Sequence, residues 1–254
     1  MSPDTSSTPP ISRRHFLLGA ASLATLTPVV RASVSLAMQS PLPLPDNAVL
    51  VFQGDSITDA GRDRSRTGPN DPAALARGYV GRIADALLAL HRDDGWKIFN
   101  RGVSGNRSVD LLARWRVDTL ALHPDLVSIL VGVNDTWHEH LAGSGISVAR
   151  YAGLCRMILE DTREALPNCR LVLCEPFALP GGAFQDAWMG ELRERSAIVR
   201  QLAQEFDAAF VPFQSMFDEA QKEHSAAELA ADGVHPTELG HDLMAQAWRK
   251  AAVL

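Results

Sequence analysis

The sequence predicts a three-layer α/β/α sandwich around a five-stranded parallel sheet. Five short segments are apolar along their whole length, without the alternation of a half-exposed strand, which indicates strands buried on both faces. Longer segments with apolar residues at helical spacing separate them, and this alternation is typical of right-handed parallel crossovers. With 254 residues, 46% of them hydrophobic, the chain is long enough for one domain with a substantial core.

The elements follow one another in a regular order. Predicted strands cover residues 48–53, 96–100, 126–132, 170–176 and 208–213. The clearest helical pattern spans residues 108–122, where apolar residues recur every three or four positions until His123 and Pro124 end it. Near the C-terminus, Thr237 is placed to cap a last helix.

The first 37 residues are expected to be an export signal and not part of the domain, which then covers residues 38–254. Arg13 and Arg14 precede an apolar run of small residues and leucines, a layout that resembles a twin-arginine signal. An anchoring helix is the alternative, but the run from Phe16 to Val30 is shorter than the roughly 20 apolar residues that span a bilayer. We therefore expect the twin-arginine export machinery as a partner, a periplasmic or secreted location and no stable membrane insertion after cleavage.

Charge and cysteine content exclude some classes of partner. Removing residues 1–37 takes away three arginines and one aspartate, so the formal net charge changes from −6 to −8. An acidic surface disfavours nucleic acid and anionic membranes. Cys155, Cys169 and Cys174 lack the spacing of a zinc site, and we expect them to be buried structural residues, with a disulfide between two of them as the alternative.

Polar and glycine-rich residues collect after the predicted strands, where ligands bind in open parallel sheets. "GDSITD" follows the first strand, "NRGVSGN" the second, "GVND" the third and "EPFALPGG" the fourth. A C-terminal "ADGVHPTELG" places Asp232 three residues before His235. These groups are expected to meet at one edge of the sheet.

This set of residues could support nucleophilic catalysis. A serine needs a base to take its proton, and the base needs a partner, roles that Ser56, His235 and Asp232 could fill. Gly105 and Asn134 could supply donors to an oxyanion. Each residue also has a plain structural interpretation: Ser56 as a turn residue, the Asp–His pair as a loop tie, and Asn134 as part of an Asx turn.

Taken together, "GDSIT", "NRGVSGN", "GVND" and "DGVHPT" resemble the SGNH hydrolases, also called the GDSL esterase and lipase family. The resemblance implies the flavodoxin-like SGNH hydrolase fold, a Ser56–His235–Asp232 triad, and an oxyanion hole formed by Ser56, Gly105 and Asn134. It implies ester hydrolysis without a metal or organic cofactor. Ile57 replaces the family's leucine, a volume-conserving change.

The second motif contains two glycines, and the resemblance favours Gly105 over Gly102 as the oxyanion donor. Because histidine in general titrates near about 6.5, we expect activity to fall on acidification.

The substrate is less sharply indicated. Trp137 and His138 follow the asparagine motif, and Trp188 lies in the loop after the fourth strand; such rings could contact a sugar or an acyl group, or could pack the loops. Members of the family with similar motifs look like carbohydrate esterases, so short acyl esters of carbohydrates are favoured over lipase or thioesterase substrates.

Three other hypotheses were weighed. A metal-dependent phosphoesterase could use Asp232, His235, His241 and Asp242, although the helical i, i+4 spacing of ligands is absent. An aspartyl-phosphate mechanism on Asp55 would need a second aspartate where Ile57 stands. A non-catalytic exported glycan-binding protein is the alternative that involves no enzyme.

Overall fold

In the computed structural model of the chain, residues 44–252 are described, and they belong to one compact unit. The predicted export signal lies outside the described residues and stays a prediction. No helix within residues 44–252 is long and apolar enough to cross a membrane.

The sheet has five parallel strands, as predicted. Its spatial order is β2-β1-β3-β4-β5, the flavodoxin-like order. The strands are β1 (Val49–Gly54), β2 (Lys97–Asn100), β3 (Leu126–Leu130), β4 (Arg170–Cys174) and β5 (Ala209–Val211). Chain order and spatial order diverge at β1, which lies between β2 and β3. A crevice is therefore expected beyond the carboxyl ends of β1 and β3.

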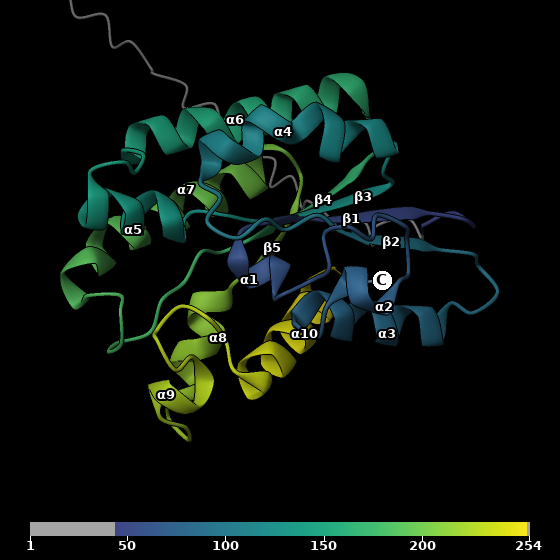
Figure 1. Cartoon of the computed structure of the whole chain (residues 1–254). Helices are drawn as coiled ribbons and strands as arrows, with labels where there is room; N and C mark the ends of the chain where they lie inside the picture. The colour runs from purple at the N-terminus through teal and green to yellow at the C-terminus, as the bar shows by residue number, and fades with distance from the viewer. Residues whose placement is uncertain (1–43, 253–254) are drawn as a thin grey trace, which may run out of the picture. The chain divides into compact units, whose positions relative to one another are not determined.

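Helices cover both faces of this sheet (Figure 1). One face packs against α4 (Ser108–Asp118), α6 (Val148–Ala165) and α7 (Met189–Glu205). The other packs against α3 (Tyr79–Leu90), α8 (Phe213–Ala220) and α10 (Glu238–Ala252). Shorter helices follow strand ends or lie in loops: α1 (Ser56–Asp59), α2 (Pro72–Leu75), α5 (Val133–Ala142) and α9 (Ala226–Leu229).

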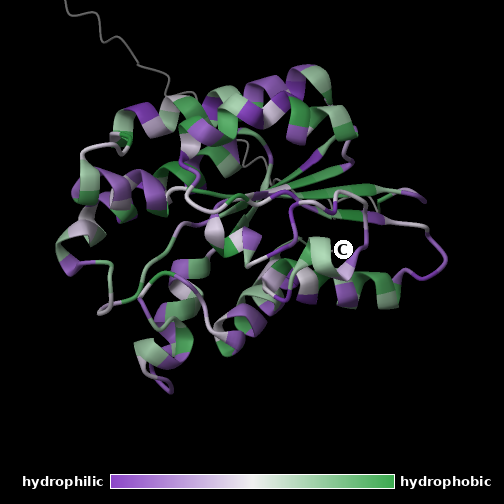
Figure 2. Cartoon of the chain, in the orientation of Figure 1, coloured by the Kyte–Doolittle hydropathy of each residue, from purple (hydrophilic) through white to green (hydrophobic). Residues whose placement is uncertain are grey.

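Hydropathy explains the layers (Figure 2). The strands are apolar on both faces, and the covering helices alternate apolar and polar positions. On one face, Trp115 of α4, Ile158 of α6 and Leu202 of α7 are buried. On the other, Trp248 of α10 is fully buried beside Phe52, with ring centroids 5.0 Å apart. The predicted three-layer sandwich is confirmed.

Element ends differ from the predictions by a few residues. β3 ends at Leu130, two residues early, because Gly132 has a φ of 138° and the chain turns there into α5. The helical pattern of residues 108–122 divides into α4 and a 3₁₀ turn (Leu120–Leu122), after which His123 takes a left-handed conformation. Thr237 caps α10 as predicted, accepting the Gly240 N–H at 3.2 Å.

The three cysteines are free, as the preferred interpretation predicted. Cys169 and Cys174 are buried, and Cys155 is half-buried. Burial is the main cause that raises the pKa of each thiol to about 12.

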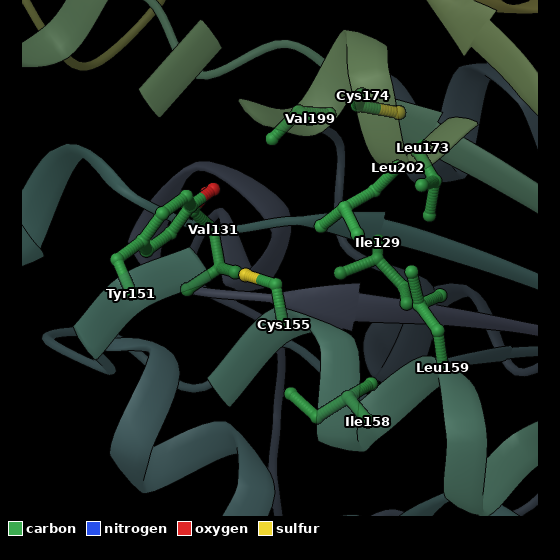
Figure 3. Close-up of a pocket in the computed structure, with 10 residues that line it drawn as sticks. All are labelled: Ile129, Val131, Tyr151, Cys155, Ile158, Leu159, Leu173, Cys174, Val199 and Leu202. Carbon is green, nitrogen blue, oxygen red and sulfur yellow. The ribbon is translucent and has the colours of Figure 1, made fainter. Parts of the chain in front are cut away.

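A small apolar cavity of about 20 Å³ lies in the core between the sheet and helices α6 and α7. Figure 3 shows side chains that line it, among them Ile129, Tyr151, Cys155 and Val199. A cavity of this size and character is expected to be dry. Its lining is apolar, and it contains none of the predicted site residues.

Substituting Val199→Ile would place one methylene into this cavity. We expect the free energy of unfolding to rise by about 0.5–1 kcal/mol, because the added group is buried without displacing neighbours. Thermal denaturation measures this directly. Val172→Ile is the matched control: Val172 is equally buried, but it lies outside the cavity lining, so the added methylene should be neutral or destabilising. Equal losses in both variants would contradict the prediction.

Candidate active site

Ser56 lies where β1 turns into α1, at the crevice expected from the strand order. Asp55 caps this short helix by accepting the Ile57 N–H at 3.0 Å. Gly54 is required just before it, since a Cβ there would lie 2.4 Å from the Leu130 carbonyl oxygen of β3. The close approach of β1 to β3 at Gly54 thus fixes the end of β1, two residues before Ser56.

Ser56 meets the C-terminal Asp–His motif. Its Oγ lies 2.8 Å from Nε2 of His235, and Nδ1 of His235 lies 2.6 Å from Oδ2 of Asp232. The other Asp232 oxygen accepts the Val234 and His235 N–H groups at 2.9 and 2.7 Å. The structure therefore brings the three predicted residues into one hydrogen-bonded chain.

The charge of Asp232 is stabilised by its hydrogen bonds. Partial burial alone would raise its pKa, but the His235 side chain and the two backbone N–H groups outweigh burial and lower the pKa below its usual range. An ionised Asp232 favours the tautomer of His235 with its proton on Nδ1, which leaves Nε2 free to accept the Ser56 proton.

The loop after β4 holds the Asp232–His235 segment, a feature that the sequence analysis missed. The Leu179 N–H donates to the Gly233 carbonyl at 2.8 Å, and the Ala183 N–H donates to the Asp232 carbonyl at 2.9 Å. A Cβ on Gly182 would lie 2.3 Å from the Asp232 carbonyl carbon, so only glycine allows this approach. The "PGG" and "DG" stretches each carry a local turn signal, but neither predicts the contact between the two loops.

Two buried aspartates hold the loop that contains Gly105. Asp59 of α1 accepts the Ser104 N–H at 3.0 Å and its hydroxyl at 3.1 Å. Asp135 of α5 accepts the Ser108 N–H at 3.1 Å and its hydroxyl at 2.5 Å. Carboxylates from two different helices thereby fix both ends of the loop. Neither aspartate was identified from the sequence, because an isolated Asp in a helix is usually solvated.

The three donors that the sequence analysis expected for the oxyanion hole are two backbone amides and one side-chain amide, and each has a hydrogen to offer. Within residues 44–252, the N–H groups of Ser56 and Gly105 have no hydrogen-bond partner. Nδ2 of Asn134 donates one hydrogen to the Asn106 carbonyl at 3.2 Å, which orients the amide and leaves its second hydrogen unused.

The two glycines of the second motif have different roles. Gly105 has a φ of +83° and faces open space, whereas a Cβ on Gly102 would lie 2.3 Å from the Asp59 backbone nitrogen. Gly102 is thus needed for packing against α1, and Gly105 is the one beside free volume. This difference agrees with the preference for Gly105 as a donor.

The structure separates the three aromatic candidates for substrate binding. Trp137 is half-buried beside His235, with ring centroids 6.1 Å apart. His138 is half-buried on α5, where burial and the charge of Arg107 lower its pKa. Trp188 is only 6% exposed, stacked on His140 and packed on Phe184, which favours the alternative that it packs the loop and offers little surface to a ligand.

The residues of the metal hypothesis do not converge. Asp242 pairs with Arg82 at 2.6 Å, and Nδ1 of His241 accepts the Tyr79 N–H at 3.1 Å. Within the described part of the chain, no three His, Cys, Asp or Glu side chains are grouped so that they could hold a metal ion. Asp55, the residue of the aspartyl-phosphate hypothesis, is 1% exposed and points into the protein as a helix cap.

Comparison with known proteins assigns the chain to a family. The family described as GDSL-like lipase/acylhydrolase matches residues 52–243. The chain belongs to this family, the SGNH hydrolases, and is a carboxylic ester hydrolase.

Individual relatives match this chain along most of their length. An acetylxylan esterase from Geobacillus stearothermophilus is 35% identical over 203 residues, which cover 78% of this chain and 91% of that protein. A crystal structure of that esterase matches with a TM-score of 0.75 at 33% identity, over 82% of this chain and 95% of that one. The crystal structure of a GDSL-like lipase candidate from Parabacteroides merdae matches with a TM-score of 0.80 at 44% identity, over 83% and 97% of the two chains.

Substituting Asp59→Asn should loosen the Gly105 loop, because an amide accepts hydrogen bonds more weakly and cannot pair with Arg64, which lies 2.5 Å from Asp59. We expect the free energy of unfolding to fall by about 1–3 kcal/mol. Hydrogen–deuterium exchange of residues 101–108 should accelerate. Asp71→Asn, which removes an exposed ion pair with Arg66, is the control and should leave exchange in this loop unchanged. Unchanged exchange in Asp59→Asn would contradict the role of Asp59.

Asp55 should make stability depend on pH. Burial is the largest cause that raises its pKa to about 7, against lowering by the Ile57 N–H and by His235. The folded protein therefore binds more protons than the unfolded chain between about pH 4 and pH 7, and stability falls as pH rises through this window. Asp55→Asn cannot ionise, so it should gain about 1–3 kcal/mol relative to the wild type between pH 4.5 and pH 8.

Urea denaturation at the two pH values measures this gain. Asp110→Asn is the control, because hydrogen bonding with Arg107 lowers the pKa of Asp110 and its contribution to stability is constant above pH 4.5. A constant difference between Asp55→Asn and the wild type would show that Asp55 is not protonated in the folded protein.

Proposed function

We propose that the protein hydrolyses short acyl esters, most readily acetyl esters, of carbohydrates through a Ser56–His235–Asp232 triad. The observation that carries the proposal is the continuous hydrogen-bonded chain from Ser56 Oγ through the His235 ring to Asp232, with bonds of 2.8 and 2.6 Å. A serine, a base and a base-orienting carboxylate in this order are what nucleophilic acyl transfer requires.

The spacing of the triad supports these roles. Catalytic variants of the Geobacillus acetylxylan esterase have been made at a serine, an aspartate and a histidine. In that protein the serine and histidine are 179 residues apart, as Ser56 and His235 are here. The aspartate precedes the histidine by three residues in both chains.

In the proposed reaction, Ser56 Oγ attacks the acyl carbonyl carbon while His235 Nε2 takes its proton. The carbonyl oxygen becomes an oxyanion, which accepts hydrogen bonds from the Ser56 and Gly105 N–H groups and the Asn134 amide. The tetrahedral intermediate then collapses, and His235 gives the proton to the departing alcohol oxygen. Water, which gives one proton to His235, then attacks the acyl carbon of the acyl-serine. The bond between this carbon and Ser56 Oγ breaks, the carboxylic acid leaves, and His235 returns the proton to Ser56 Oγ. These steps need only the donors and acceptors named here.

The carbohydrate preference has two supports. The acetylxylan esterase is a relative along most of both chains. The groove of about 460 Å³ beside Ser56 has charged and polar side chains among its lining residues and is not a long apolar channel. Together with the export signal proposed for residues 1–37, these observations support a periplasmic or secreted enzyme that acts on glycans.

The triad is tested with p-nitrophenyl acetate and the variant Ser56→Ala. We expect the turnover number to fall on the order of 10³-fold or more, because no other group replaces the nucleophile. Ser65→Ala, which removes an exposed hydroxyl bonded to Asp63, is the matched control and should keep wild-type activity. A Ser56→Ala enzyme that retains wild-type turnover would rule out the serine mechanism. Comparing acetyl esters with longer acyl esters then separates an acetyl esterase from a lipase.

A further inference from the structure

The groove beside Ser56 is bounded on one side by the polypeptide that follows the proposed triad. Pro236, Glu238 and His241 line this wall. Arg77, Gly78 and Arg82, at the start of α3, also line the groove, and α3 begins in contact with His241. Ser56 and His235 are among the lining residues, so a molecule bound in the groove lies beside the reacting groups.

The direction of proton transfer decides which part of an ester enters the groove. His235 must hand its proton to the departing alcohol oxygen, so the alcohol lies beside His235. One flank of the His235 ring is covered by Trp137, which itself packs against Phe184. The His235 side chain is nevertheless 45% exposed, and it lines the groove together with Ser56. The alcohol part of the ester is therefore placed in the groove.

Two charged side chains along the groove have no partner within residues 44–252. Arg77 and Glu238 are exposed, and the side chain of neither forms an ion pair or a hydrogen bond with a described residue. Arg82, in contrast, is already paired with Asp242. The groove thus offers one free cation and one free anion, whose charges balance.

His241 adds a neutral donor. Its Nδ1 accepts the Tyr79 N–H at 3.1 Å, which leaves the ring proton on Nε2. Burial, followed by the charge of Arg82, lowers the pKa of His241 to about 4, so the ring stays neutral at physiological pH. A sugar hydroxyl both donates and accepts hydrogen bonds, and it suits a groove with donors at Arg77 and His241 and an acceptor at Glu238.

We propose that this groove is the alcohol subsite of the enzyme, and that Arg77, Glu238 and His241 bind the hydroxyl groups of an uncharged oligosaccharide next to the scissile ester. The inference rests on the proposed function and extends it by naming the residues that select the alcohol. An alkyl or aryl alcohol would displace water from these three polar groups without giving them hydrogen-bond partners, and a polyanionic sugar would meet the negative charge of Glu238.

The test keeps the acyl group constant and changes the alcohol. Acetylated xylo-oligosaccharide and p-nitrophenyl acetate are compared on the wild type, Arg77→Ala and Glu238→Gln. We expect KM for the oligosaccharide to rise about 5-fold or more in each variant, as expected for a lost hydrogen bond to a charged group. The ratio of kcat/KM for the oligosaccharide to kcat/KM for p-nitrophenyl acetate should therefore fall about 5-fold or more. Arg150→Ala, an exposed arginine on α6, is the control and should change neither substrate.

His241 is left unsubstituted because its Nδ1 also holds the start of α3. Equal losses on both substrates, or no change on the oligosaccharide, would overturn the groove as the alcohol subsite while the esterase activity stands.

A binding measurement separates this inference from the proposed function. Deacetylated xylo-oligosaccharide is tested as an inhibitor of p-nitrophenyl acetate hydrolysis, beside an oligosaccharide that carries uronic acids. One outcome is that the deacetylated oligosaccharide inhibits the wild type and inhibits Arg77→Ala less, while the acetylated oligosaccharide is not hydrolysed. This result would support the groove as the sugar-binding site and reject the proposed substrate. Absence of inhibition by either oligosaccharide, or tighter binding of the acidic one, would overturn the inference.

Discussion

The whole site depends on a backbone contact between two distant loops. Residues 179–183, after β4, lie against the carbonyl groups of Asp232 and Gly233 and donate two N–H groups to them. No side chain fits at Gly182, and Gly233 has a φ of +82°, so both positions require glycine. This contact holds the loop before α10, while Trp248 of α10 packs on Phe52 of β1, and together they place a C-terminal histidine beside a serine 179 residues earlier in the chain.

Around this contact, the parallel sheet supplies the other groups in fixed positions. Gly54 allows β1 to approach β3, and Ser56 and Asn134 then emerge from neighbouring strands at the point where the strand order reverses. Asp59 and Asp135, buried beneath them, fix the two ends of the Gly105 loop. Donors that are already in position do not need to reorient when negative charge develops on a bound ester. In such sites this preorganisation supplies much of the rate enhancement.

The sequence predicted the elements of the fold and the polar groups of the site, because both depend on local patterns. Continuous apolar runs identified all five strands, and the motifs at their ends identified Ser56, Asn134 and the Asp232–His235 pair. Contacts between distant segments could not be predicted from the sequence, because the roles of Gly182, Asp59 and Asp135 exist only once the chain is folded. The sequence left open for the same reason whether Trp188 contacts a ligand or packs the loop, since a tryptophan in a loop gives no sign of whether it faces solvent or stacks inward on His140.

The exposure of the proposed triad residues has a consequence for the size of the proposed substrate. The side chains of His235 and Asp232 keep 45% and 39% of their surface accessible. An ester can therefore approach from the side, and it need not sit at the end of a chain that threads through a tunnel. For the proposed carbohydrate ester, an acyl group in the middle of a long polymer would be as reachable as one at its terminus.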